Sequence, residues 1–80
     1  MDATVFEWVQ GRLASVLELD PSEITPTSHL ADDLDADSID LIETINAAET
    51  QFGTKIEEQE LYDLETAGQL AELIERSMPR

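Results

Sequence analysis

The apolar residues of this chain recur every three or four positions along three long stretches, which is the spacing of one face of an α-helix. The first stretch covers residues 5–17. Thr4 and Glu7, at its start, have the spacing of a capping box, in which two side chains satisfy free amides at the start of a helix. We therefore expect an amphipathic first helix, with a buried face of Val5, Val9, Leu13, Val16 and Leu17.

A single turn of helix and a long loop should follow. Asp20, Pro21 and Glu23 have the order of an N-cap, a first-turn proline and a capping partner. Pro26 leaves room for about one turn only. The loop should then run to about Asp37.

The second long stretch has the most regular helical pattern in the chain. It should begin at Asp37 or Ser38, and Gly53 suits the position just past its end. Its expected buried residues are Leu41, Ile42, Ile45, Ala48 and Phe52.

Two further helices are expected near the carboxyl end. A short third helix should contain Ile56, Leu61 and Leu64. Thr66 and Gln69 then have capping-box spacing at the start of a fourth helix, which Pro79 closes. No stretch alternates with the period of a β-strand. The pattern predicts an all-α bundle of three longer helices and one short third helix, in a single domain over residues 1–80.

Composition narrows the classes of function. The 80 residues include no cysteine, so apolar packing must stabilise the chain without disulfides or thiolate metal sites. The formal net charge of −15 disfavours binding to nucleic acid and to anionic membranes, and favours basic protein surfaces. Neither a signal peptide nor an apolar run of membrane-spanning length is visible. We expect a soluble, cytoplasmic monomer that does not insert into membranes.

The candidate chemistry lies around Ser38, a hydroxyl at an expected helix start among several carboxylates. The simplest interpretation is that Asp37 or Ser38 only caps the helix, with Asp40 as the capping partner of Asp37. This interpretation explains where the helix begins. It does not explain why so many acidic residues gather there.

Calcium binding is a second interpretation. Asp33, Asp35 and Asp37 match the first three side-chain ligands of an EF-hand loop. The required glycine would fall at Ser38, however, and the closing glutamate at Thr44. The spacing therefore argues against a specific calcium site, and we expect no bound metal.

Nucleophilic catalysis by Ser38 is a third interpretation, and it requires a nearby base. His29, the only histidine, lies nine residues earlier in the loop and has no orienting partner in the local sequence. No glycine-rich oxyanion loop is present, and carboxylates would oppose a developing oxyanion. We expect no catalytic residues.

A fourth interpretation is covalent modification by another enzyme. The segment resembles the attachment motif of the acyl carrier protein family, Asp-Ser-Leu preceded by Leu-Gly-Ala or a close variant. The residues that match are Leu34, Ala36, Asp37, Ser38 and Asp40. Asp35 stands where the family usually has glycine, which tolerates positive φ more easily, and Ile39 stands in place of leucine.

The resemblance continues from about Val5 to Ile74, nearly the whole chain. Comparable residues in the family's order of helices are Ile24, Leu30, Glu43, Phe52, Ile56, Leu64 and Thr66. The resemblance implies an acyl-carrier-like four-helix bundle that is not an enzyme. It also implies a phosphopantetheine arm, derived from coenzyme A and attached to Ser38.

The resemblance further implies a set of partners. A phosphopantetheinyl transferase would use Mg²⁺ and coenzyme A to attach the arm. Acyl-transfer, ketosynthase or other acyl-processing enzymes would then dock through basic surfaces. The residues expected to meet these partners are Asp37, Ile39, Asp40, Glu43 and Glu49.

Some apolar residues admit two interpretations, as plain core or as the lining of a slot for the acyl chain. These candidates are Ile42, Ile45, Ala48, Leu61, Leu64 and Ala67. The family usually has bulkier residues at positions 48 and 67, so either a cavity or a closer approach of the third helix is expected.

Two alternatives stay open at this point. An acidic helical interaction domain without a prosthetic group would account for the charge, but not for Asp37 and Ser38 at a helix start. An aminoacyl or peptidyl carrier would fit less well with the acidic approach to Ser38. Fatty-acid, polyketide and related lipid biosynthesis all use such carriers, and Asp35 with the two small alanines favours a specialised one.

Overall fold

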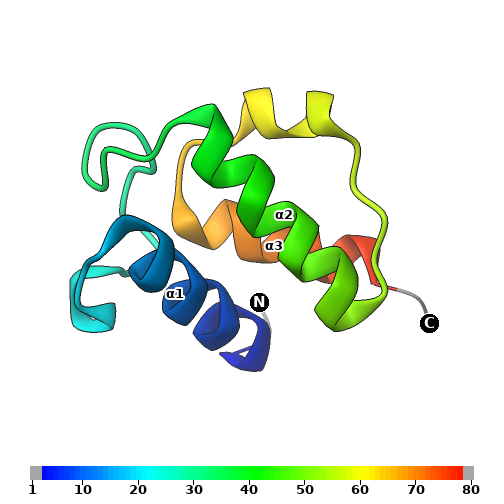
Figure 1. The fold of residues 1–80 in the computed structure, drawn as a ribbon, viewed down its shortest axis with the longest axis horizontal. Helices are drawn as coiled ribbons and strands as arrows, with labels where there is room; N and C mark the ends of the chain where they lie inside the picture. The colour runs from blue at the N-terminus through cyan, green and yellow to red at the C-terminus, as the bar shows by residue number, and fades with distance from the viewer. Residues whose placement is uncertain (1–2, 79–80) are drawn as a thin grey trace.

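The computed structural model describes residues 3–78, which form helices joined by loops (Figure 1). The elements in chain order are α1 (Ala3–Leu17), η1 (Pro21–Glu23), α2 (Ser38–Phe52), η2 (Glu58–Asp63) and α3 (Ala67–Ser77). The two η elements are 3₁₀-helices. This confirms the expected all-α fold with three longer helices and one short third helix. Within the described residues, the only β-type pairing is one isolated bridge between His29 and Thr66.

Helix α1 begins earlier than its capping pattern suggested. Thr4 lies inside the helix, after Ala3, so the expectation that Thr4 caps it is wrong. At the other end, Glu18 adopts a left-handed conformation with φ of 58°. The Leu19 N–H donates to the Ala14 carbonyl at 2.9 Å, which is the outer hydrogen bond of a Schellman motif.

The turn η1 is capped as its sequence predicts. The Asp20 carboxylate accepts hydrogen bonds from the Ser22 N–H at 2.9 Å and the Ser22 hydroxyl at 2.8 Å. These two donors hold the pKa of Asp20 below its usual value. The Asp20 N–H in turn donates to a Glu23 oxygen at 3.0 Å, which completes the capping box.

The core lies where α1 packs against α2 and α3. Its largest fully buried side chains come from the three long helices and from the loop after η1: Val5, Val9, Leu13, Ile24, Thr44, Leu70 and Ile74. Thr44 is a polar member that the apolar pattern did not predict. Trp8 is half-buried, and its ring meets that of Phe52 edge-on, with centroids 5.2 Å apart. Met78, just after α3, also packs against this core.

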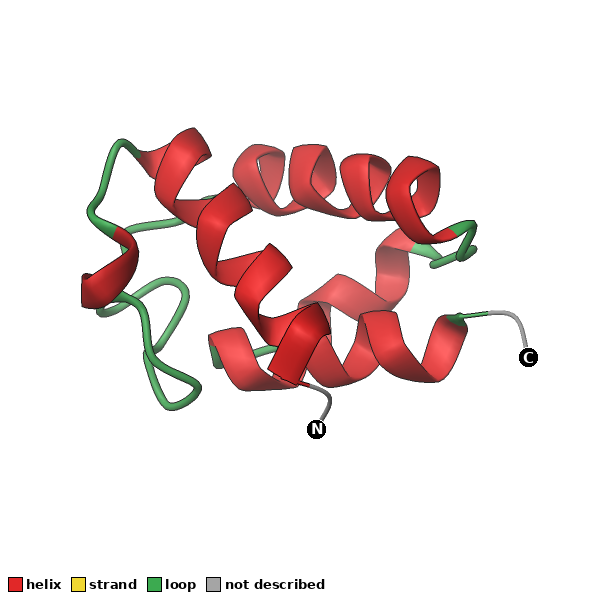
Figure 2. Ribbon diagram, turned by 90° about the horizontal axis from the view of Figure 1, so that it is seen from below, coloured by secondary structure: helices red, strands yellow, loops and turns green. Residues whose placement is uncertain are grey.

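The long loop that precedes α2 lies at one end of the molecule (Figure 2). Three backbone hydrogen bonds join it to the start of α3: Leu30 N–H to Glu65 at 2.8 Å, Ala67 N–H to Ser28 at 3.0 Å, and Gly68 N–H to Pro26 at 2.9 Å. The loop that leads to Ser38 is therefore held in place by residues at and just before the start of α3.

The short third helix, η2, is more restricted than its apolar pattern suggested. Ile56 precedes it and Leu64 follows it, so only Leu61 of the three expected apolar residues lies within it. Leu61 points into the core, whereas Tyr62 is 74% exposed. No helix within residues 3–78 combines the length and the apolar character needed to cross a bilayer.

Candidate functional site

Ser38 is the first residue of α2, and its side chain is exposed. Asp37 caps the helix: its Oδ1 accepts from the Asp40 N–H at 2.9 Å, and its own N–H donates to Asp40 Oδ2 at 3.2 Å. The expected helix start and capping pair are confirmed. Because Asp37 does the capping, the Ser38 hydroxyl makes no hydrogen bond to any described residue and is available for chemistry.

The first amides of α2 are also available. The Ser38 and Ile39 N–H groups have no acceptor among residues 3–78, since capping uses the amide of Asp40. Free amides and the helix dipole give this end of α2 a partial positive charge. Such a helix end suits an anionic group, such as a phosphate, bound at the Ser38 hydroxyl.

The loop before Ser38 keeps a backbone shape that favours glycine, although it contains none. Asp35 has φ of 55°, in the left-handed region. Its N–H donates to the Ala31 carbonyl at 3.2 Å, and the next amide, that of Ala36, donates to the Leu30 carbonyl at 2.8 Å. Aspartate tolerates this conformation better than most residues, and the hydrogen bonds on either side stabilise it.

Two carboxylates of this segment, those of Asp33 and Asp37, have backbone partners. Asp33 Oδ2 accepts from the His29 N–H at 2.8 Å, and Asp37 caps α2. No three acidic or histidine side chains of the described residues are grouped so that they could hold a metal ion. Likewise, no base among residues 3–78 lies within hydrogen-bond reach of the Ser38 hydroxyl, as a serine nucleophile would need.

The residues expected to contact partners differ in their exposure and in their hydrogen bonding. Ile39 is 64% exposed, and Glu43 is exposed on the same helix. Asp37 and Asp40 are both engaged in the capping box. Glu49 is half-buried, and its Oε2 accepts from the Ile56 N–H at 3.1 Å, so it also ties the chain after α2 to the helix.

The candidates for an acyl slot lie mostly in the core. Ala48 and Ala67 are fully buried, and Ile45 and Leu61 are nearly so. Ile42 and Leu64 are half-buried at the surface of this cluster. Helices α2 and η2 contact each other, and Ala67 is the first residue of α3.

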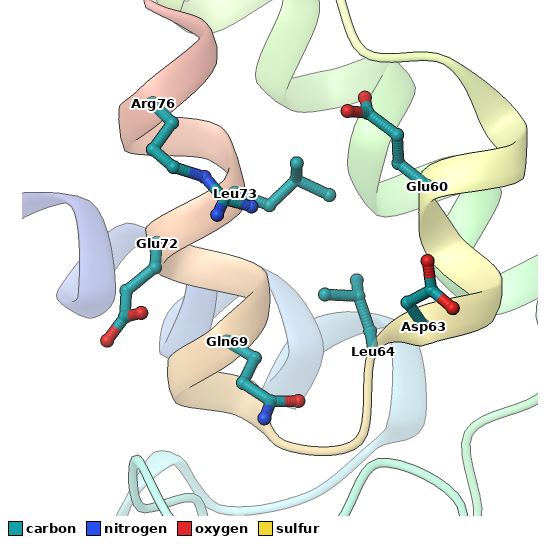
Figure 3. Close-up of a pocket in the computed structure, with 7 residues that line it drawn as sticks. All are labelled: Glu60, Asp63, Leu64, Gln69, Glu72, Leu73 and Arg76. Atoms are coloured by element: carbon teal, nitrogen blue, oxygen red, sulfur yellow. The ribbon is translucent and has the colours of Figure 1, made fainter.

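Two hollows open on either side of Leu64. One, of about 340 Å³, lies between η2 and α3: in Figure 3, Glu60 and Asp63 of η2 face Leu73 and Arg76 of α3 across it. The other, of about 330 Å³, lies between the loop before α2 and the segment after η2. Leu64 is the only slot candidate that lines either of these two hollows. Nothing in the periodicity of the sequence indicated them, because their walls come from segments distant in the chain.

Comparison with known proteins shows which family has this arrangement. The family model described as "Phosphopantetheine attachment site" matches residues 7–74, which include α2 and its preceding loop. The chain is 32% identical over 74 residues to an acyl carrier protein of Thermotoga maritima, covering 92% of this chain and 91% of that protein. It is 36% identical over 69 residues to an acyl carrier protein of Saccharopolyspora erythraea, covering 86% and 73% of the two chains. It is 36% identical over 70 residues to an acyl carrier protein of Thermosynechococcus vestitus, covering 88% and 86%.

The helical fold and the matched segment define a carrier domain with a phosphopantetheine attachment site. The chain belongs to the acyl carrier protein family. Its prosthetic group is therefore phosphopantetheine, and its family is one of carriers that do not catalyse reactions themselves. The resemblance noted in the sequence is confirmed.

The structure fits the group. A phosphodiester needs a free hydroxyl acceptor, and the Ser38 hydroxyl is exposed and makes no hydrogen bond to a described residue. The negative charge of a phosphate there would face the free amides of Ser38 and Ile39. Asp37 and Asp40 oppose that charge, but each already accepts a backbone N–H.

Proposed function

We propose that Ser38 is the attachment residue and that the chain carries acyl intermediates as thioesters on the arm attached there. The observation that carries this proposal is the exposed, unbonded hydroxyl at the start of α2, inside the segment that matches the attachment-site family. Asp37, rather than Ser38, caps the helix, so modification of Ser38 costs no capping hydrogen bond.

Attachment would be a displacement at phosphorus, in which the serine oxygen replaces the nucleotide part of coenzyme A. A phosphopantetheinyl transferase would join the Ser38 oxygen to the arm's phosphorus while the nucleotide part of coenzyme A leaves, and the hydroxyl proton would pass to the transferase. The helix start then stabilises the phosphodiester through its free amides. The arm supplies a terminal thiol, which this cysteine-free chain lacks.

Partners would dock on the exposed face of α2. Ile39, next to Ser38, offers an apolar contact, and Glu43, one turn further along α2, offers a free carboxylate; together they suit a basic surface with an apolar recess. Asp37, Asp40 and Glu49 would add negative charge, although each also stabilises the fold. These partners would include the transferase and acyl-processing enzymes such as ketosynthases.

The cargo would belong to fatty-acid, polyketide or related biosynthesis, carried by a cytoplasmic monomer. A long acyl chain that entered the slot would have to open the core around Ala48 and Ala67, since both are fully buried. Ile42 and Leu64, at the surface of that cluster, would be the first residues it meets.

The proposal is tested by loading the protein with butanoyl-coenzyme A and a broad-specificity transferase, and then treating it with neutral hydroxylamine. A thioester is cleaved by hydroxylamine, so the intact mass should fall by the butanoyl group while the arm remains. The matched variant Ser38→Ala should gain no mass at all. A wild-type mass that hydroxylamine leaves unchanged would contradict the thioester.

A further inference from the structure

The hollow of about 340 Å³ between η2 and α3 has charged groups of opposite sign on its two walls (Figure 3). Glu60 and Asp63 of η2 form one wall, and Arg76 of α3 lies on the other. Leu64 and Leu73 point into the space between them. Residues of α2 are not among the described residues that line this hollow, so it is separate from the face of α2 proposed above for docking.

The acidic wall follows from the geometry of η2. A 3₁₀-helix has three residues per turn, so residues three apart share a face. Leu61 is turned into the core, while Glu60 and Asp63 share another face, about 6 Å apart along the helix axis. A guanidinium carries five donors in a planar fork and can bond two carboxylates at once. This wall therefore suits the side chain of an arginine.

The guanidinium of Arg76 is unpaired within the part of the chain that the structure describes. No ion pair crosses the hollow between the described residues of η2 and α3, although their charges are opposite. Glu72 stands one turn earlier on α3, at a spacing that permits an ion pair, but its side chain points away from η2 (Figure 3). An exposed pair at this spacing is weak. Arg76 is therefore available to a carboxylate of another molecule.

The two walls are joined by a short connection with several hydrogen bonds. Gln69 Oε1, at one end of the hollow, accepts from the Glu65 N–H at 2.7 Å and the Thr66 N–H at 3.2 Å. At the end of η2, the Leu64 N–H donates to the Leu61 carbonyl at 3.1 Å. These bonds hold the last turn of η2 and the first turn of α3 together, so the hollow is preformed at this end.

We propose that this hollow is a second docking site, which receives a segment of a partner protein with an arginine and a carboxylate on either side of an apolar side chain. The arginine would bond Glu60 and Asp63, and the carboxylate would bond Arg76. The apolar side chain would cover the two leucines between them. A purely basic segment would instead place like charge against Arg76. The inference does not need an arm on Ser38, so it goes beyond the proposed function.

The test is an NMR titration of the isotope-labelled full-length chain with three pentapeptides whose ends are blocked. They are Arg-Ser-Leu-Ser-Glu and two versions with one charge each, Arg-Ser-Leu-Ser-Gln and Gln-Ser-Leu-Ser-Glu. In an extended peptide the first, third and fifth side chains point to the same side, so they can enter the hollow together. The doubly charged peptide should shift the amides of Gln69 and Leu73, and bind about twofold to fivefold more tightly than either other peptide.

Matched variants separate the hollow from the overall charge of the chain. Arg76→Gln should make Arg-Ser-Leu-Ser-Glu and Arg-Ser-Leu-Ser-Gln bind equally, because the glutamate loses its partner. Arg12→Gln removes an exposed arginine of α1 that does not line the hollow, and should preserve the difference between the two peptides. Asp63→Asn should weaken both peptides that contain arginine. Equal effects of Arg76→Gln and Arg12→Gln would overturn the inference.

The remaining outcomes distinguish this inference from the proposed function. Ser38→Ala should bind the peptides as the wild type does, since the hollow needs no arm. Equal affinities of the three peptides for the wild type, shifts confined to α2, or the absence of saturable shifts would overturn the docking site and leave the attachment residue unaffected. Failure of Ser38 to accept the arm, with peptide binding as expected, would contradict the proposed function alone and support the docking site.

Discussion

Gly68 lies directly against the backbone of Pro26. Its N–H donates to the Pro26 carbonyl at 2.9 Å, and a Cβ atom added at position 68 would stand 2.7 Å from that same oxygen. At this point the loop before α2 meets the first turn of α3. It joins the segment that presents Ser38 to a helix thirty residues further along the chain.

Substituting Gly68 by alanine should therefore loosen this junction. The added methyl group cannot avoid a backbone oxygen without moving the loop, so Gly68→Ala should lower the free energy of unfolding by about 1–3 kcal/mol. Urea denaturation followed by circular dichroism measures the change. A loss below about 0.5 kcal/mol would mean that the loop is not held at this point.

Gly11 is the matched control for this substitution. It lies inside α1, and a Cβ atom there would meet nothing within 4 Å. Gly11→Ala should raise the free energy of unfolding by about 0.5–1 kcal/mol, because alanine is the better helix former. If Gly11→Ala stabilises the protein and Gly68→Ala destabilises it in the same denaturation assay, the change in stability depends on the space around each glycine.

Asp35 is held at φ of 55° where the family usually has glycine. Asp35→Gly removes the strain of a left-handed side-chain residue and should raise the free energy of unfolding by up to about 1 kcal/mol. Asparagine tolerates this conformation and lacks the charge, so Asp35→Asn measures the effect of charge alone. Destabilisation by glycine in a thermal melt would contradict the assigned conformation.

Asp37 has a structural role and a proposed role in recognition, and two variants separate them. Asp37→Ala removes the cap of α2 and should cost about 0.5–2 kcal/mol, whereas Asp37→Ser keeps a good cap and should change stability by only a few tenths. If Asp37 also contacts the transferase, both variants should lower kcat/KM for loading by a similar factor. Loading by Asp37→Ser at the wild-type rate would limit Asp37 to capping.

Glu43 and Glu49 should behave differently although both are acids of α2. Glu49→Ala leaves the part-buried Ile56 N–H without its acceptor and should cost about 1 kcal/mol of stability. Glu43 is exposed, so Glu43→Gln should change stability by less than about 0.5 kcal/mol. Glu43→Gln should instead lower kcat/KM for transferase loading, most strongly at low salt. Salt-independent loading by this variant and the wild type alike would argue against docking at Glu43.

Local signals in the sequence predicted much of the fold. The capping boxes at Asp20, Asp37 and Thr66 are present in the structure, and Gly53 ends α2 with φ of 67°. Such signals are readable because they depend on residues three or four positions apart. The similar spacing of Thr4 and Glu7 gave a wrong helix start, because the same spacing also occurs inside a helix.

Contacts between distant segments could not be read in this way. The approach of Gly68 to Pro26 and the hydrogen bond from Ile56 to Glu49 depend on how helices and loops pack. The hollow of about 330 Å³ likewise draws its walls from the loop before α2 and from Leu64 after η2. Ser38 could be proposed from the sequence because the helix start and the motif around it are both local features.

The most direct test of the account is where the arm attaches. The purified protein is incubated with coenzyme A, Mg²⁺ and a broad-specificity transferase, alongside Ser38→Ala and the exposed-serine control Ser15→Ala. Intact mass should show one added phosphopantetheine on the wild type and on Ser15→Ala, and none on Ser38→Ala. If the folded wild type gains no mass while a known carrier is modified in the same mixture, or if Ser38→Ala is modified equally, then Ser38 is not the attachment residue.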